Sequence, residues 1–393
     1  MSVLANVKQG EELAAAEDFR RQLQERSLQG GHPSVAERLR WLEENSHLLD
    51  QIERVSWGSA SGTGLSPAEF KKMLAAVPLS SPHDEPFTHS IVSMLSQQVE
   101  DACRTLAIPL YSGVAYGSSA ALEVSATKCG VPFADSSIVT ISVGFLTFCS
   151  SISRMLCLAL PHEPDGNRVK VSFAPEIVLA KLESDADLVG YWTAVLGAYA
   201  GGRGPLSVGY RLVPYPASYT RMQMLFSMER FSIAHEYGHH IFRHGTTSGL
   251  GVGGDPDALG NESEADLFAL SLDRYIGMND PSPNRFSASG AAAVALFRLH
   301  DCVKRIRQIL LTGDDAIQPD GIHPPTSDRI AAFDALDHQF PYPNREHLRK
   351  MRLDVATVID EMYLRLRPAY VKMHEQGVRP LSSQVFDPPS RLL

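Results

Sequence analysis

Cysteine is scarce in this sequence, and its few residues are scattered. Among 393 residues there are five cysteines, none in a Cys-x-x-Cys pair: Cys103, Cys129, Cys149, Cys157 and Cys302. An odd number without close pairs argues against a disulfide scaffold and against a zinc site built from cysteines. The scarcity fits a reducing compartment, so we expect a cytoplasmic protein.

An excess of positive charge is also lacking. The chain has 36 Lys and Arg residues against 45 Asp and Glu residues, a net charge of −9 at pH 7. Proteins that bind nucleic acid without sequence preference use a positive field to neutralise phosphates. We therefore expect no nucleic-acid partner.

Long apolar runs are missing as well. The most hydrophobic stretch, 138–160, is interrupted by serines and by Arg154, and it falls short of the ~20 apolar residues of a spanning helix. The first ten residues have no apolar core behind basic residues, so we expect no secretory signal. The stretch is interpreted as a buried strand followed by a core helix, and no membrane span is predicted.

What is present is an ordinary globular composition, with 44% hydrophobic and 21% charged residues. Strand-like segments, the clearest at 138–144 and a weaker one at 169–173, lie between helical ones. The predicted fold class is α+β, mostly helical, with a small mixed sheet and a helical N-terminal extension. Asn261 is predicted to cap the helix at 262–276, and glycines at 245, 277 and 313 are predicted to end the helices at 221–244, 262–276 and 288–311. The predicted helices cover 11–28, a segment from 34, 66–77, 89–106, 221–244, 262–276, 288–311, 327–339 and 345–374.

One predicted helix contains the sequence His235-Glu236-Tyr237-Gly238-His239, an HExxH pattern. Histidines four residues apart lie about 40° apart around a helix, so both imidazoles can bind one ion. Glu236 lies next to that face, where it can take a proton from an attacking water. A short pattern of this kind also occurs by chance, in helices whose histidines only pack.

A catalytic zinc site usually has a third protein ligand. Just over twenty residues beyond His239, Glu262 and Asp266 lie four apart on the next predicted helix. We expect Glu262 to bind the metal and Asp266 to accept the N–H of a ligating histidine, with His235 as its expected partner. Glu264 is the alternative ligand, although a solvated acid in the first helical turn is the preferred interpretation. His240 and His244 are expected to form a second pair on another face, as helix-end histidines near the C-terminal dipole, with a second metal site as the alternative.

HExxH followed by a Glu-x-x-x-Asp helix resembles the gluzincin metallopeptidases, and within them the HtpX-type and the soluble Lit-like peptidases. Three flanking segments are similar to HtpX-type sequences: the predicted strand before Phe145-Leu146, the run Glu262-Ser-Glu-Ala-Asp266-Leu-Phe-Ala, and His323-Pro-Pro followed by Arg329-Ile330. The resemblance covers about residues 120–335. HtpX-type enzymes are membrane proteins, and this chain lacks their spanning segments. The soluble ImmA/IrrE group has a similar ligand helix.

The resemblance implies a zinc-dependent endopeptidase with Zn²⁺ held by His235, His239 and Glu262, and with Glu236 as general base. It also implies His323 or Arg329 as a donor to the oxyanion. The alternatives are that His323 caps or packs at a helix start and that Arg329 makes a structural ion pair. Tyrosines 210, 215 and 219 are further candidates. The predicted domains are a helical extension (1–60), a helical connection (61–110), a zinc metallopeptidase domain (111–345) and a C-terminal helix with tail (346–393).

The expected partner is a protein or peptide substrate. The N-terminal helices could dock that partner or be a packing extension, and the glycine-rich stretch 246–260 could be a flap or a plain loop. The strand at 138–143 could pair with an extended peptide or lie inside the sheet. The alternative function is a zinc-binding regulatory or sensor protein without turnover, which the presence of Glu236 argues against.

Overall fold

The computed structural model describes residues 3–29, 78–84, 86–119, 121, 123–165, 168–202, 208, 211–245, 257–317, 321, 323–339 and 344–381. The helices predicted from residue 34 and at 66–77 lie outside these ranges, as does most of the glycine-rich stretch. Helices predominate, and the strands form two small sheets, which confirms the α+β class. In the described part of the chain, no helix is both long and apolar enough to cross a membrane.

The chain divides into two compact units. The first consists of Met1–Leu146 and Arg230–Leu272, and the second of Thr147–Glu229 and the chain from Asp273 onward. The predicted domain boundaries at 60, 110 and 345 are not tested by this division and stay predictions.

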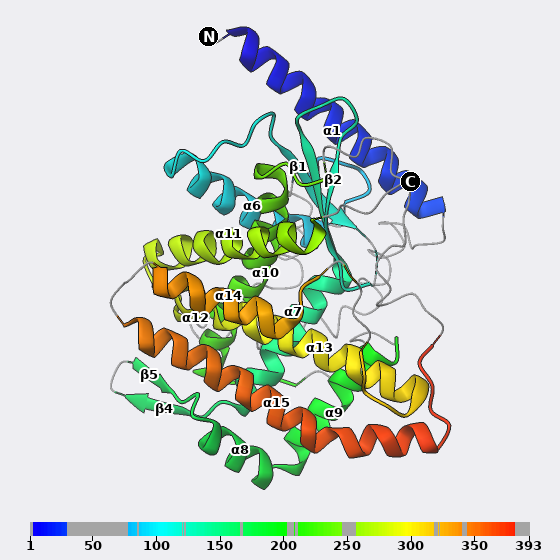
Figure 1. Cartoon of the computed structure of the whole chain (residues 1–393), viewed down its shortest axis with the longest axis vertical. Helices are drawn as coiled ribbons and strands as arrows, with labels where there is room; N and C mark the ends of the chain where they lie inside the picture. Colours follow the sequence, from blue (N-terminus) through cyan, green and yellow to red (C-terminus); the bar gives the residue numbers. More distant parts are fainter. Residues whose placement is uncertain are drawn as a thin grey trace, which may run out of the picture. The chain divides into compact units, whose positions relative to one another are not determined.

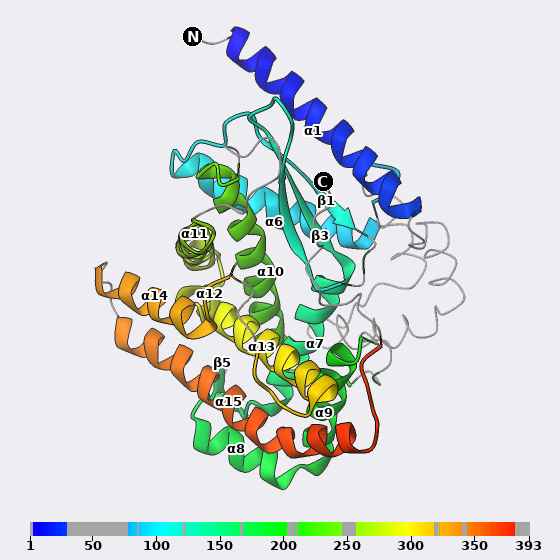
Figure 2. The ribbon, with the colours of Figure 1, turned by 45° about the vertical axis from the view of Figure 1, so that its right-hand side comes forward.

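The first unit is built on a three-stranded mixed sheet in the order β1-β3-β2. Figure 1 labels β1 and β2, and Figure 2 labels β1 and β3. Strand β3 (Ser137–Ser142) pairs in parallel with β1 (Val114–Ser119) and antiparallel with β2 (Ala126–Gly130). Ile138, Val139 and Ile141 are buried, so both faces of this central strand are covered, and Thr140 is half-buried. The predicted strand is confirmed, and its central place leaves no free edge on β3 for a peptide.

Helix α1 (Val3–Gln29) lies along this sheet (Figures 1 and 2). Its apolar residues Leu13, Ala16, Phe19 and Leu23 pack against Ala115 and Ile138 and their neighbours. The guanidinium of Arg20 is buried and pairs with Asp84 at 2.7 Å. The apolar face of this predicted extension is therefore used within its own unit. Its predicted role in docking a partner stays a prediction.

Three further helices complete the first unit. Helix α6 (Pro86–Thr105) confirms the helix predicted at 89–106. Helix α10 (Ala217–Ile241) belongs to this unit from Arg230, and α11 (Ala258–Asn279) belongs to it up to Leu272. Helix α7 (Val143–Ala159) follows β3 without a break, as the interpretation of 138–160 predicted, and from Thr147 it is part of the second unit.

The second unit is helical, with one hairpin. In Figure 1 the long helix α13 lies beside α15, and it also packs against α9. One face of α13, including Val294, Leu299 and Ile306, is fully buried, as the apolar spacing of its sequence predicts. The elements are β4 (His162–Asp165), β5 (Arg168–Val171), α8 (Pro175–Ser184), α9 (Ala186–Ala200), α12 (Arg285–Ser289), α13 (Ala291–Thr312), α14 (Thr326–Gln339) and α15 (Arg345–Glu375).

Both predicted ends of α11 differ from the ends in the structure. The helix begins at Ala258, so Asn261 lies inside its first turn rather than at the cap, and its backbone N–H bonds to the carbonyl of Asp257. The helix also continues past Gly277. A Cβ on Gly277 would lie 2.3 Å from the Cβ of Ser287. The missing side chain therefore lets this part of α11 pack closely against Ser287 within the second unit, and the glycine does not end the helix. Gly313, with φ of +87°, does end α13 as predicted.

Candidate metal centre

The HExxH sequence forms the last turns of α10, inside the first unit. His235 is 9% exposed and Glu236 7%, while Tyr237 is fully buried. The hydroxyl of Tyr237 donates to Glu100 on α6 at 2.8 Å, which fixes the rotation of α10 about its axis. This anchoring directs the two motif histidines toward α11.

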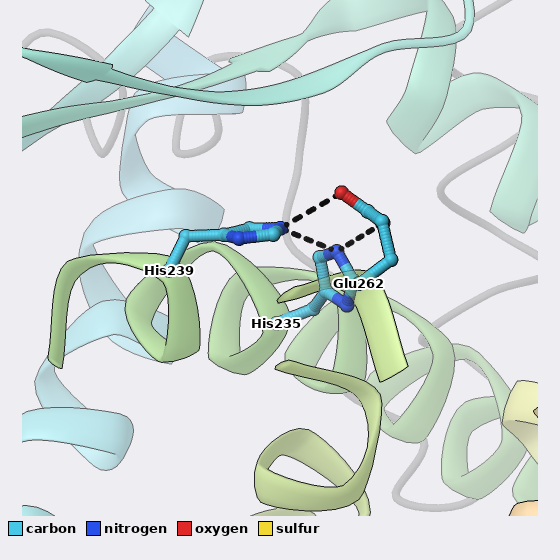
Figure 3. Close-up of side chains that lie close together, drawn as sticks. All are labelled: His235, His239 and Glu262. Carbon is cyan, nitrogen blue, oxygen red and sulfur yellow. Dashed lines mark hydrogen bonds and ion pairs between the residues drawn. The ribbon is translucent and has the colours of Figure 1, made fainter. Parts of the chain in front are cut away.

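His235, His239 and Glu262 meet at one point (Figure 3). The Nε2 atoms of the two histidines are 3.0 Å apart, and each lies 3.2 Å from a different oxygen of the Glu262 carboxylate. A tetrahedral ion with bonds of about 2.0–2.2 Å holds neighbouring ligand atoms about 3.3–3.6 Å apart. The observed separations are slightly shorter than that. Two imidazoles and one carboxylate are also a donor set suited to Zn²⁺, so the residues fit a divalent cation.

Glycine at position 238 allows α11 to come close to α10 at this point. A Cβ on Gly238 would lie 3.0 Å from the Cα of Ala265 and 3.2 Å from the ring of Phe268. The small residues at 238 and 265 therefore let the two helix backbones approach. This contact positions Glu262, three residues before Ala265, opposite the motif histidines.

Asp266 lies one turn after Glu262 and binds the other nitrogen of His235, with Nδ1 and Oδ1 3.0 Å apart. This is the predicted partner, and the carboxylate is only 1% exposed. Burial acts to lower the pKa of His235, but the hydrogen bonds to Asp266 and Glu262 outweigh it and raise that pKa to about 10. The carboxylates of Asp266 and Glu262 therefore stabilise a positive charge at His235.

The carboxylate of Glu262 responds in the opposite direction. Burial acts to raise the pKa of Glu262, yet its hydrogen bonds to His235 and His239 outweigh burial and hold the pKa well below the usual range. Glu262 is therefore ionised at neutral pH, as a metal ligand must be.

Lys128, on the edge strand β2, is a residue of this site that the sequence did not indicate. Its Nζ donates to the backbone carbonyl of His244 at 2.8 Å. Burial lowers the pKa of Lys128, and the negative charge of Glu236 is among the influences that oppose this. Lys128 therefore lies close enough to the candidate general base to interact with its charge. Nothing in the sequence around position 128 marks it, because more than one hundred residues separate it from the motif.

The end of α10 differs from the prediction. The helix ends at Ile241, and Arg243 adopts the left-handed conformation with φ of +60°. The N–H of Arg243 bonds to the carbonyl of His240, and the N–H of His244 bonds to that of His239, which is a Schellman motif. Gly245, predicted to end the helix, lies two residues beyond. The guanidinium of Arg243 lies 4.1 Å from the centre of the Tyr111 ring, a contact that helps to hold this turn.

The same turn overturns the expected pairing of His240 with His244. His240 bonds instead to the hydroxyl of Ser137 and to the carbonyl of Leu110, both at 2.9 Å. His244 lies against His239, with their Nδ1 atoms 2.8 Å apart, and its Nε2 lies 3.0 Å from Glu264. Glu264 is thus half-exposed and paired with a histidine, rather than simply solvated.

The residues predicted for the oxyanion are not part of this cluster in the first unit. His323 belongs to the second unit, where it is exposed and precedes α14. Arg329 is in the same unit, with its guanidinium 3.7 Å from the centre of the Phe297 ring. Tyr215 and Tyr219 also belong to that unit, and Tyr210 lies outside the described residues.

Comparison of the chain with protein-family models, with curated proteins and with solved structures finds no match.

Proposed function

We propose that this chain is a zinc-dependent endopeptidase of gluzincin type, hydrolysing peptide bonds of a protein substrate. The observation that carries the proposal is the triangle of His235, His239 and Glu262, with Asp266 bonded to the back of His235. Two helix-borne histidines, a carboxylate from a second helix and a buried acid behind one histidine are the parts that a catalytic zinc site needs.

The chemistry of the proposed reaction divides among few groups. Zn²⁺, when bound, lowers the pKa of a water molecule and polarises the scissile carbonyl. Glu236 accepts the proton of the attacking water and delivers it to the leaving nitrogen. With an ion bound in place of the proton, His235 and His239 would present unprotonated Nε2 atoms. Asp266 would then accept the remaining N–H of His235 at Nδ1.

The oxyanion donor stays a proposal taken from the resemblance, with His323 as the named candidate. If His323 has this role, His323→Ala lowers kcat and leaves KM nearly unchanged, because the contact is made only in the transition state. Equal kinetics for the variant and the parent would remove His323 from the mechanism.

The Glu236→Gln variant tests the proposed reaction. Removing the general base should lower hydrolysis by at least about 100-fold while one equivalent of zinc is still bound, since Glu236 is not a ligand. The measurement compares new peptide termini in the host proteome after expression of the parent, of the variant and of a control. Glu176→Gln is a matched control, since it removes an exposed carboxylate on α8.

Termini that appear with the parent and with Glu176→Gln, but not with Glu236→Gln, are the expected result. If Glu236→Gln binds zinc and retains every biological activity of the parent, then proteolysis is not the function. The regulatory or sensor alternative would then take its place.

A further inference from the structure

We propose that His244 and Glu264 form a positioning chain for His239, separate from the one that Asp266 provides for His235. The inference rests on the metal site of the proposed function and adds two residues to it. The observation is a continuous line of side chains in the first unit: Glu264, His244, His239 and then the ligand triangle.

The protons along this line have one consistent arrangement. A metal-ligating His239 must present an unprotonated Nε2, so the proton of its neutral ring is on Nδ1. That N–H then donates to Nδ1 of His244, 2.8 Å away. The proton of the neutral His244 ring is consequently on Nε2, where it donates to the Glu264 carboxylate at 3.0 Å. Each donor meets an acceptor, and the line ends on the side chain of Glu264.

His235 shows the same arrangement with one link fewer. Its Nε2 faces the triangle, and its Nδ1 donates directly to Asp266. Both ligating histidines are therefore oriented from α11: His235 by an acid one turn after Glu262, and His239 by an acid two residues after it, acting through His244. Partners of this kind fix ring orientation and increase ligand basicity.

The backbone holds His244 in place from two sides. The Schellman motif at the end of α10 turns the chain back, so that the N–H of His244 bonds to the carbonyl of His239 itself. Lys128 on β2 binds the carbonyl of His244. The His244 side chain is 9% exposed and packs against the Phe242 ring. Its ring is thus fixed by contacts that do not depend on a bound ion.

The test is the affinity of the purified full-length protein for Zn²⁺, measured by competition with a chromophoric chelator. His244→Ala removes the acceptor for His239 and should weaken zinc binding by about 10-fold or more. In His244→Asn an amide oxygen takes roughly the place of the histidine Nδ1 and should restore most of that loss. Glu264→Gln keeps an oxygen acceptor without the charge and should have a smaller effect of the same sign. Glu176→Gln is the control and should bind like the parent.

A second readout separates positioning from folding. The visible absorption of the Co²⁺-substituted protein reports ligand geometry, so it should change in His244→Ala and recover in His244→Asn. Unchanged affinity and an unchanged Co²⁺ spectrum in His244→Ala would overturn the inference, whatever happens to the melting temperature. A loss that Asn does not restore would overturn it as well.

These outcomes are independent of the proteolysis test. Weaker zinc binding in His244→Ala, together with no hydrolysis by the parent, would support the positioning chain and contradict the proposed reaction. Normal zinc binding in His244→Ala, together with hydrolysis that depends on Glu236, would contradict the chain and leave the reaction standing.

Discussion

The side chains that bind behind the two motif histidines decide which nitrogen each ring offers. Asp266 occupies Nδ1 of His235, and His244 occupies Nδ1 of His239, so both rings turn Nε2 toward Glu262. A histidine binds a metal through its unprotonated nitrogen, so in the proposed site these hydrogen bonds affect affinity as well as geometry.

Asp266→Asn tests the contact behind His235. The amide loses the negative charge that stabilises His235 as a ligand, and zinc affinity should fall by roughly 10–100-fold. Asp273→Asn, two turns further along α11, is a matched control because Asp273 is equally buried and accepts hydrogen bonds from Ser227 and Ser287. Titration with zinc in the presence of a competing chelator measures both variants.

The control variant is expected to lose stability without losing zinc affinity. Equal zinc affinities for Asp266→Asn and the parent would contradict the proposed role of Asp266.

At the scale of elements, the contact of α10 with α11 places the carboxylate of the candidate metal centre. The two helices touch through Gly238 and Ala265, and the ligands His239 and Glu262 lie next to these small residues. Any added volume at this contact has to push the helices apart, and the ligand triangle with them.

Gly238→Ala should therefore destabilise the fold, although alanine is the better helix former. The new Cβ would lie 3.0 Å from the Cα of Ala265, and overpacking of this kind costs about 1–3 kcal/mol. Gly190→Ala on α9 is the control, because no atom lies within 4 Å of its Cβ position. It should gain up to about 1 kcal/mol from helix propensity. Thermal unfolding of both variants checks this, and a Gly238→Ala protein as stable as its parent would contradict the close contact.

The sequence predicted elements better than it predicted their ends. Helices α6, α14 and α15 lie within a few residues of their predicted ranges, because the apolar spacing that predicts a helix is local. Helix α11 begins three residues before its predicted cap, and α10 ends with Arg243 in a conformation that usually requires glycine. In the second case the ring of Tyr111, remote in the sequence, supports the turn. Local sequence rules cannot include such a partner.

For the molecule as a whole, an acid buried in the second unit should make stability depend on pH. Glu229 is 3% exposed, and burial raises its pKa to about 8, against the opposing attraction of Arg221. The folded state thus holds this proton more tightly than the unfolded state does. Stability is fully present below the unfolded pKa, near 4.5, and is lost as pH rises through about 8.

Glu229→Gln removes this titration. The variant should be more stable than the parent at pH 9, by about 2–5 kcal/mol at most, and the difference should shrink toward pH 5. Glu361→Gln, an exposed acid on α15, serves as the control. Urea unfolding at both pH values measures the effect. A parent and a Glu229→Gln variant with parallel pH profiles would show that Glu229 does not titrate in this range.

The sequence by itself determined which residues were candidates for the metal centre. The four-residue spacings of His235 with His239 and of Glu262 with Asp266 follow from helical periodicity, which is local. Scarce cysteine directed the expectation toward histidine and carboxylate ligands. The absence of a long apolar helix among the described residues also agrees with what the sequence predicted.

Only the tertiary structure decided how the histidine pair meets Glu262, and which side chains bind the second nitrogen of each histidine. The crossing at Gly238 brings Glu262 to the histidines, and a turn at Arg243 places His244 and Glu264 behind His239. Lys128 comes from a strand more than one hundred residues earlier in the chain. Contacts of this kind depend on packing between segments that are distant in the sequence, so no local pattern of residues predicts them.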